Sequence, residues 1–266
     1  MLKESARQII RKSLAGLRHP VRIVLFTSDV GCDACPGARE LAAALKEASP
    51  KVVLETYDLT MDRDKSQEYG VKRVPAFVVQ GQGVRSVTFS GSVEDIAMML
   101  LLDAIVGVAE GRVWFPGQVL GPLGMIRREV AVQVLIENDC NLCRPVAETA
   151  IGLALSSRFV STEIIMADEF PDLLAKHRIK VLPYTIFGPK LHLEGHVTES
   201  MFLEMLFHAE GKGGESDRRC AVCGSPSPDV ICSSCRTKIQ AEAVDHKRKG
   251  EHLHERGSAA EGGHHH

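Results

Sequence analysis

Eight cysteines arranged as four Cys-x-x-Cys pairs are the side chains in this sequence with the most evident chemistry. They are Cys32 and Cys35, Cys140 and Cys143, Cys220 and Cys223, and Cys232 and Cys235. Sulfur atoms at this spacing can form a reversible disulfide with each other or, as thiolates, bind a metal ion. A secreted scaffold would scatter its cysteines through a short chain, whereas the first two pairs lie far apart in large domains rich in apolar residues. The pattern therefore indicates redox or metal sites rather than structural cross-links.

The first two pairs belong to an internal repeat. Residues of the first copy recur 108 positions later, with Cys32, Cys35 and Pro75 matching Cys140, Cys143 and Pro183. A similar apolar run also precedes each pair, at 24–26 in the first copy and at 134–136 in the second. A repeat of this length has the size of a domain, so the sequence indicates a duplicated domain rather than a solenoid.

Each of these two pairs precedes a segment with helical periodicity, at 36–48 and at 146–155. The free N–H groups and partial positive charge of a helix N-terminus stabilise a thiolate on the first cysteine. That thiolate can attack a substrate disulfide, and the second cysteine, one turn further on, can then resolve the mixed disulfide. We therefore predict Cys32 and Cys140 to be nucleophiles and Cys35 and Cys143 to be resolving residues.

The elements that would position these cysteines follow one order in both copies. Strands are expected at 21–27, 51–57, 76–80 and 84–90, and again at 131–136, 160–165, 184–187 and 191–194. Helices are expected at 36–48, 61–68 and 93–108, again at 146–155, 169–177 and 199–208, and before both copies at 2–17. Strand, helix, strand, helix, hairpin and helix is the order of the thioredoxin core. The fold class is thus predicted to be α/β, with two tandem thioredoxin-like domains and a small C-terminal zinc module with four cysteine ligands.

Over residues 1–210 the chain resembles the tandem glutaredoxin-like protein disulfide oxidoreductases, which carry a Cys-x-x-Cys followed by proline in each of two thioredoxin-fold units. Cys32-Asp33-Ala34-Cys35-Pro36 fits that pattern, and Cys140-Asn141-Leu142-Cys143-Arg144-Pro145 delays the proline by one position. The layout is also similar to the N-terminal tandem domain of flavin-dependent alkyl hydroperoxide reductases, which keeps one active pair. The resemblance implies exchange of protein disulfides, with electrons from a thioredoxin-reductase-like flavoprotein.

The two repeated prolines stand where a thioredoxin fold places its cis proline, in the loop that faces the active-site cysteines. Val74-Pro75 and Leu182-Pro183 each come directly before a short apolar strand. A rigid turn at this point leaves backbone groups free to dock the extended chain of a substrate. We therefore expect these four residues to bind substrate.

The dipeptides between the cysteines differ between the two centres. Asp33 places a carboxylate in the first centre, where it should oppose a thiolate. The dipeptide of the second centre is neutral, and Arg144 follows its resolving cysteine. On charge alone, the sequence predicts the lower pKa and the faster reaction with protein substrates for Cys140.

The last two pairs predict a metal site. Eight residues separate Cys220-Ala221-Val222-Cys223 from Cys232-Ser233-Ser234-Cys235, and four thiolates in two such knuckles suit tetrahedral zinc. We expect structural zinc held by Cys220, Cys223, Cys232 and Cys235. The alternative is a further redox relay that passes electrons to Cys32 or Cys140.

Composition and charge exclude several other classes of function. The formal net charge of -2 provides no excess of positive charge to attract nucleic acid or an anionic membrane. The first twenty residues lack the apolar core of a signal peptide, and the longest apolar stretch, 96–108, is interrupted by Asp103. We expect a cytoplasmic protein without membrane or nucleic acid partners. No flavin or nicotinamide site is visible, so another protein would supply the electrons.

These observations predict thioredoxin-like unit 1 at 1–110, a linker at 111–124 and thioredoxin-like unit 2 at 125–211. A zinc-ribbon-like module at 217–240 and a polar tail at 241–266 would follow. The expected function is thiol–disulfide exchange on protein disulfides. Two alternatives stay open: electron donation to a peroxiredoxin in peroxide detoxification, and a non-catalytic adaptor whose thioredoxin-like units and zinc module bind a partner.

Overall fold

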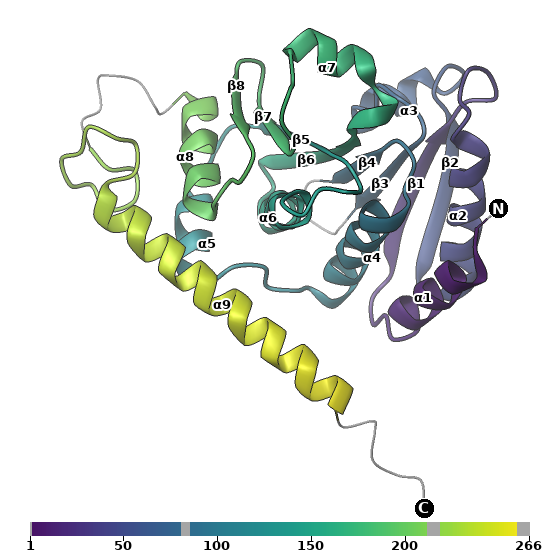
Figure 1. Cartoon of the computed structure of the whole chain (residues 1–266), viewed down its shortest axis with the longest axis horizontal. Coiled ribbons are helices and arrows are strands. Elements are labelled where there is room, and N and C mark those ends of the chain that lie inside the picture. The colour runs from purple at the N-terminus through teal and green to yellow at the C-terminus, as the bar shows by residue number, and fades with distance from the viewer. Residues whose placement is uncertain (1, 81–85, 212–218, 260–266) are drawn as a thin grey trace, which may run out of the picture. The chain divides into compact units, whose positions relative to one another are not determined.

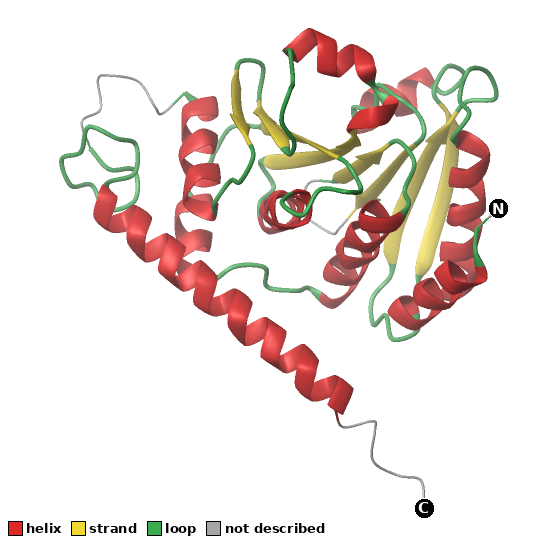
Figure 2. Ribbon diagram, viewed as in Figure 1, coloured by secondary structure: helices red, strands yellow, loops and turns green. Residues whose placement is uncertain are grey.

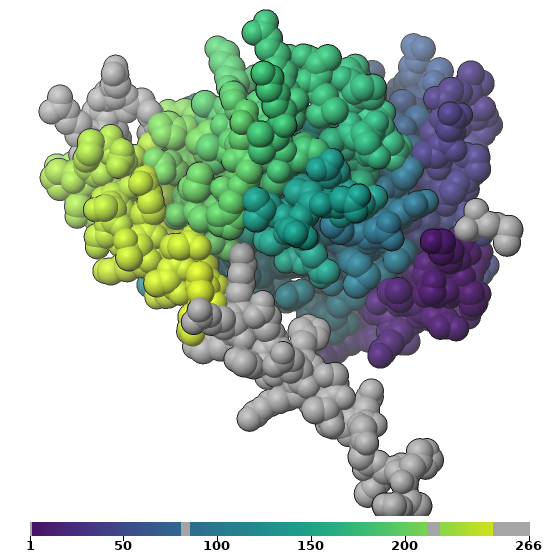
Figure 3. All heavy atoms as spheres, in the orientation of Figure 1, coloured from purple at the N-terminus to yellow at the C-terminus, as the bar shows by residue number. Residues whose placement is uncertain are grey.

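The computed structural model describes residues 2–80, 86–211 and 219–259, with side chains described up to residue 246; the remaining atoms are grey in Figure 3. Three parts of the predicted elements lie outside these ranges: residues 84 and 85 of the strand expected at 84–90, residues 217 and 218 of the predicted zinc module, and residues 260–266 of the predicted polar tail. The chain divides into two compact units. One comprises Met1–Trp114 with Arg128–Val197, and the other Phe115–Arg127 with Thr198–His266.

The first unit is built on one eight-stranded sheet in the order β2-β1-β3-β4-β6-β5-β7-β8 (Figures 1 and 2). The first repeat contributes β1 (Val21–Thr27), β2 (Val52–Asp58), β3 (Ala76–Gln80) and β4 (Val87–Ser90). The second contributes β5 (Val130–Ile136), β6 (Val160–Met166), β7 (Tyr184–Phe187) and β8 (Leu191–Glu194). The predicted bounds of β1, β3, β7 and β8 are confirmed. The sequence did not predict that both repeats share one sheet.

The repeats join edge to edge through β4 and β6, which pair in parallel with Val87 opposite Thr162 and Ser90 opposite Ile165. β1 runs antiparallel to β3 and β3 antiparallel to β4, while β5 runs parallel to β6. Strands β1, β4, β6 and β5 therefore all point the same way. As a consequence, β1 and β5, which lead into the two cysteine pairs, end at the same edge of the sheet.

Helices cover both faces of this sheet (Figure 1). Its helices are α1 (Glu4–Leu14), α2 (Cys35–Ala48), α3 (Arg63–Tyr69), α4 (Asp95–Glu110), α6 (Cys143–Ser156), the 3-10 turn η1 (Ala167–Glu169) and α7 (Pro171–His177). Tyr69 of α3 packs against a core that includes Phe26 and Val78, and Leu174 of α7 packs against the matching core around Leu135. The two cysteine helices begin at Cys35 and Cys143, slightly before the predicted starts, so each resolving cysteine is the first helical residue.

Helices α3 and α7 end in the same backbone conformation but with different residues. Gly70 follows α3 with φ 69°, and Arg178 follows α7 with φ 53°. A side chain at positive φ costs about 1 kcal/mol or more, which glycine avoids. We expect Arg178→Gly to raise the free energy of unfolding by about 0.5 to 1 kcal/mol, because Arg178 is exposed and its side chain contributes little packing. Urea denaturation measures this gain; the reciprocal Gly70→Arg should lose a similar amount, and an unchanged midpoint for both variants would contradict the explanation.

The second unit contains α5 (Gly117–Leu123), α8 (Glu199–Glu210) and α9 (Ser233–Ala259). Helix α5 lies in the segment expected to be a linker, and it buries Val119 and Leu123 although Gly121 and Pro122 are poor helix formers. Glu210 of α8 accepts a hydrogen bond from the Arg127 N–H at 2.5 Å, and Arg236 of α9 pairs with Glu204 of α8 at 2.7 Å. Across the described part of the chain, every helix is too short or too polar to span a bilayer.

Candidate redox centres and candidate metal centre

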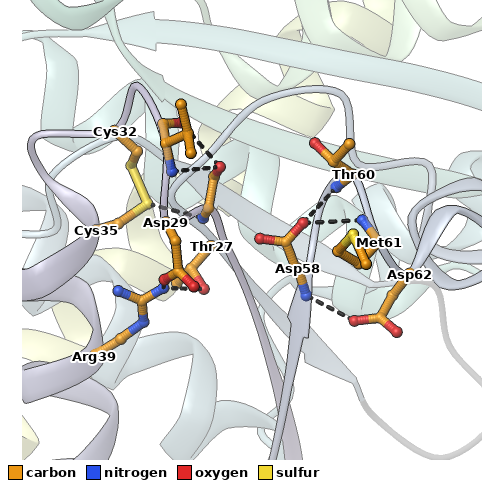
Figure 4. A network of polar contacts seen from close by, with 11 residues as sticks. Thr27, Asp29, Cys32, Cys35, Arg39, Asp58, Thr60, Met61 and Asp62 are labelled. Atoms are coloured by element: carbon orange, nitrogen blue, oxygen red, sulfur yellow. Dashed lines mark hydrogen bonds and ion pairs between the residues drawn. A yellow bond between two sulfur atoms is a disulfide. The ribbon is translucent and has the colours of Figure 1, made fainter.

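The first cysteine pair lies between the end of β1 and the start of α2 and forms a disulfide, with a Cα–Cα distance of 5.4 Å (Figure 4). Cys35 is fully buried, whereas Cys32 is partly exposed. The Ser28 N–H donates a hydrogen bond to Cys35 Sγ at 3.3 Å, and the Cys35 N–H donates to the Cys32 carbonyl at 3.3 Å. Of the two sulfur atoms, that of Cys32 is therefore the one a substrate can reach.

Polar contacts hold the loops on either side of this disulfide (Figure 4). Arg39, one turn along α2 from Cys35, donates to Asp29 Oδ1 at 2.5 Å and to Thr27 Oγ1 at 3.2 Å. In the loop after β2, the N–H groups of Met61 and Thr60 donate to the Asp58 carboxylate and lower its pKa. The positive charge of Arg39 is thus compensated by Asp29 beside the first centre.

Cys32 shares a pocket of about 660 Å³ with Val74 and Pro75. The peptide bond between Val74 and Pro75 is cis, and the Gly91 N–H donates to the Pro75 carbonyl at 2.9 Å. The structure therefore brings together the predicted nucleophile of the first centre and its predicted substrate-binding residues. The same pocket is also lined by residues of the second repeat, Asn138, Met166, Asp168, Glu169 and Phe170, which the sequence analysis did not identify.

Direct contacts between the repeats hold these pocket residues of the second repeat in place. Arg73, two residues before Pro75, pairs with Glu163 of β6 and stacks on the Phe170 ring at 5.4 Å. Glu163 also accepts hydrogen bonds from Ser90 Oγ and from Gln133 Nε2, each at 2.7 Å. Nearer the pocket, Glu169 Oε1 accepts from the Ser92 N–H at 2.5 Å. Glu163, the acidic residue of the strand 160–166, is the sequence signal that could have indicated this junction.

The second cysteine pair occupies the matching position between β5 and α6, and its disulfide has a Cα–Cα distance of 5.3 Å. Cys143 is fully buried, and Cys140 is only 9% exposed. The Leu182–Pro183 bond is cis, and Pro183 precedes β7, where Tyr184 lies opposite Leu135 of β5. The strand register therefore places Pro183 beside the end of β5, as it places Pro75 beside the end of β1.

Arg144, whose positive charge was expected to stabilise a thiolate at Cys140, already pairs with two carboxylates. Its Nε lies 2.7 Å from Glu148 Oε1, and its Nη2 lies 3.5 Å from Asp103 Oδ2 on α4. Two carboxylates thus offset the positive charge of the guanidinium near the second centre. Its stabilisation of a Cys140 thiolate is correspondingly reduced.

The last four cysteines form one cluster in the second unit. The Sγ atoms of Cys220, Cys223, Cys232 and Cys235 all lie within 4.8 Å of one another, and those of Cys223 and Cys232 are 3.8 Å apart. Tetrahedral zinc with Zn–S bonds of about 2.3 Å separates its sulfur ligands by about 3.8 Å. The donor set and the spacing therefore fit a zinc ion with four thiolate ligands.

The backbone around the cluster has the turns that such a site needs. The N–H groups of Val222 and Cys232 donate to Cys220 Sγ at 3.4 and 3.3 Å, and Gly224, with φ 73°, donates to the Cys220 carbonyl. Hydrogen bonds from the Ser225 side chain and backbone lower the pKa of the Cys223 thiol to about 6, while burial raises the pKa of Cys235. N–H donors directed at the sulfur atoms are favourable for thiolates and hence for metal binding.

Comparison with known proteins places this geometry among thioredoxin-like folds. No family model matches the sequence. A probable thioredoxin from Methanothermobacter thermautotrophicus is 42% identical over 62 residues, which are 23% of this chain and 72% of the relative. A protein disulfide oxidoreductase structure from Aeropyrum pernix is 25% identical with a TM-score of 0.71, over 79% of this chain and 95% of that one. A structure of the alkyl hydroperoxide reductase component AhpF from Enterococcus faecalis is 20% identical with a TM-score of 0.68, over 77% of this chain and 99% of that one.

Proposed function

The chain belongs to the thioredoxin family and is a thiol–disulfide oxidoreductase, and from this premise we propose that both of its N-terminal cysteine pairs exchange disulfides with protein substrates. The observation that carries the proposal is the pocket in which Cys32, at the entry to α2, lies with Val74 and Pro75. It combines an accessible sulfur, a helix N-terminus that stabilises a thiolate, and a backbone edge for an extended substrate.

In the reductive direction, the Cys32 thiolate attacks one sulfur of the substrate disulfide, forms a mixed disulfide and displaces the other sulfur as a thiolate, which takes a proton from water. Cys35 then loses its proton and attacks Cys32 Sγ. The second substrate thiol leaves, and the Cys32–Cys35 disulfide remains. Two electrons have passed to the substrate and must be replaced by an external dithiol. The oxidative direction reverses each step.

The same roles apply to Cys140 as nucleophile, Cys143 as resolving residue and Leu182-Pro183 as the substrate edge of the second centre. The electron donor we propose is a thioredoxin-reductase-like flavoprotein, and the compartment is the cytoplasm. We also propose the boundaries 1–110, 125–211 and 217–240 as those of the inherited modules.

Insulin reduction by dithiothreitol tests this proposal. The wild-type chain should accelerate the reduction, and a variant with both Cys32→Ser and Cys140→Ser should not, because neither centre then has a nucleophile. The double variant should retain the far-ultraviolet circular dichroism of the wild type, which controls for folding. A wild-type chain that performs no better than buffer would contradict the proposal and favour the adaptor alternative.

Electron donation to a peroxiredoxin is the second candidate, and the similarity in fold to a component of an alkyl hydroperoxide reductase is the observation that favours it. The two candidates share their chemistry and differ in the disulfide that is reduced. Oxidation of the pre-reduced chain by an oxidised peroxiredoxin, followed in a single turnover, separates them. A rate constant that greatly exceeds the one for insulin would favour the second candidate.

For the C-terminal cluster we propose a structural zinc ion held by Cys220, Cys223, Cys232 and Cys235. When bound, the ion would cross-link the two short turns that carry its ligands. The chain's residues prepare the site through the N–H groups directed at Cys220 and through Cys235 in the first turn of α9. The cluster thereby joins the 219–232 segment to that helix.

Substituting one ligand should empty this site. We expect the wild-type chain to contain one zinc per molecule and Cys235→Ser to retain less than about a tenth of it, because three thiolates hold the metal much more weakly than four. Elemental analysis after purification in chelator-treated buffer measures the content. Ser234→Ala, within the same pair, is the matched control and should keep its zinc. A wild-type chain that contains no zinc, and in which thiol reagents show these four cysteines to be paired as disulfides, would contradict the metal site and favour the redox relay.

A further inference from the structure

We propose that the pocket at the first redox centre selects disulfides whose flanking residues are positively charged. This inference rests on the proposed function and specifies the substrate class of that centre. Four carboxylates line the pocket beside Cys32: Asp33, Glu94, Asp168 and Glu169. Asp33, Glu94 and Asp168 are exposed and Glu169 is partly buried, so a bound chain would meet three of these charges directly. We call these four carboxylates the acidic wall of the pocket. Both repeats contribute to it, because Asp33 and Glu94 belong to the first repeat and Asp168 and Glu169 to the second.

No positive charge in the lining balances these groups. Among the described residues that line this pocket or the adjoining one of about 280 Å³, none is lysine or arginine. The adjoining pocket shares Asp33 and Glu94 and adds Glu40, whose carboxylate is paired with Arg7.

Arg39, four residues after Cys35, and Arg73, two residues before Pro75, are paired with other residues. Arg39 contacts Asp29 and Thr27, and Arg73 contacts Glu163, which lies at the junction of the repeats rather than in the pocket lining. The described lining of this pocket therefore carries four carboxylates and no lysine or arginine. Concave sites lined by one sign of charge concentrate the field and raise the association rate of oppositely charged ligands.

The rest of the lining is suited to the apolar part of a peptide. Val74, Pro75 and Met166 provide an apolar surface next to the disulfide. Lysine and arginine have long apolar stems that can cover such a surface while their charged ends reach a carboxylate. A cystine with a basic residue one or two positions away would satisfy both parts of the pocket.

At the second centre, the positions that match Asp33 and Glu94 carry no carboxylate. By alignment of the repeats, Asn141 stands at the position of Asp33, His196 at that of Ser92 and Thr198 at that of Glu94. On the side of the first centre, β4 is followed in the sheet by β6 of the second repeat. On the side of the second centre, β5 is followed by β7 and then by β8, which is the edge strand of the described sheet, so no further repeat pairs there. The acidic wall thus belongs to the first centre, because only there does the next repeat supply a second side.

The test uses the full chain with Cys140→Ser and Cys143→Ser, so that only the first centre reacts. Its substrates are three fluorogenic peptide disulfides of equal length, in which lysine, glutamate or serine flanks the cysteines. We expect kcat/KM for the lysine peptide to exceed that for the glutamate peptide about tenfold at low salt. High salt should reduce this ratio, because it screens exposed charges.

Glu94→Gln with Asp168→Asn, added to that chain, should lower the ratio severalfold. The matched control is Glu47→Gln with Asp64→Asn, which neutralises two exposed carboxylates outside both pockets and should preserve the ratio. A ratio near one, or a ratio that the pocket variant leaves unchanged, would overturn the charge selection while leaving the proposed function intact. Failure to reduce even the serine peptide and insulin would instead overturn the activity of this centre, and the inference with it.

Discussion

Replacing Cys32 by serine is expected to remove most of the disulfide reductase activity of the chain, whereas Cys140→Ser is expected to leave most of it. Cys32 is partly exposed and opens on a pocket shared with Pro75, while Cys140 is 9% exposed. Disulfide exchange requires direct contact between the attacking sulfur and the substrate sulfur, so access limits its rate. We expect about a tenth or less of wild-type insulin reduction for Cys32→Ser and more than half for Cys140→Ser.

This order is the reverse of the one expected from the dipeptides. That expectation depended on the charge of Arg144, which the structure shows to be paired with Glu148 and Asp103. Asp33, Glu94 and Asp168 still oppose a thiolate at Cys32, but all three are exposed, so water and salt screen part of their effect. Access therefore outweighs the remaining difference in charge.

The comparison has an internal control, because Cys35→Ser and Cys143→Ser remove the resolving residues of the same two centres. If the first centre dominates, Cys35→Ser should impair turnover more than Cys143→Ser does. A Cys140→Ser chain with less activity than a Cys32→Ser chain would contradict the argument from access and restore the one from charge.

Gly91→Ala is expected to lower the free energy of unfolding by about 3 kcal/mol, because it combines overpacking with an unfavourable backbone angle. Gly91 has φ 102° and lies where the first repeat meets the second. A Cβ atom there would be 2.8 Å from Met166 Cβ and 3.2 Å from Glu169 Oε1. Both of these residues line the pocket at Cys32, so the substitution should also reduce activity at the first centre.

Gly195 is the matched control, since it holds the same position in the second repeat. Its φ is 69°, and no atom of the described residues would lie within 4 Å of an added Cβ. Gly195→Ala should therefore cost only about 1 kcal/mol, which comes from the backbone angle alone. Urea denaturation of both variants measures the difference. Equal destabilisation would show that close packing between the repeats at Gly91 contributes nothing.

The sequence was most informative where a local pattern determines the outcome. The repeat offset located both cysteine pairs and both prolines, because duplicated domains keep the spacing that their site requires. Strand bounds such as 21–27 and 184–187 followed from short apolar runs with clear ends. Helix α5 was missed because Gly121 and Pro122 oppose a helix locally, whereas the burial of Val119 and Leu123 in the second unit outweighs that preference.

Tertiary pairing is what local patterns could not predict. Apart from Glu163, nothing in 87–90 or 160–166 points to the pairing of β4 with β6, yet this pairing brings Met166, Glu169 and Phe170 to the first centre. The burial of Cys140 and the ion pairs of Arg144 are likewise properties of the folded chain. These features turn two centres with similar sequences into two sites with different access.

Intact-mass analysis of a trapped complex tests the central claim, disulfide exchange through Cys32, most directly. A chain with Cys35→Ser, Cys140→Ser and Cys143→Ser retains Cys32 as its only N-terminal redox cysteine and cannot resolve a mixed disulfide. Incubated with intact insulin, it should gain the mass of a whole insulin molecule, whose chains stay joined by the interchain disulfide that has not reacted, lose it on treatment with dithiothreitol, and show the link at Cys32 on peptide mapping. An unmodified chain, or a link confined to the C-terminal cysteines, would contradict the claim.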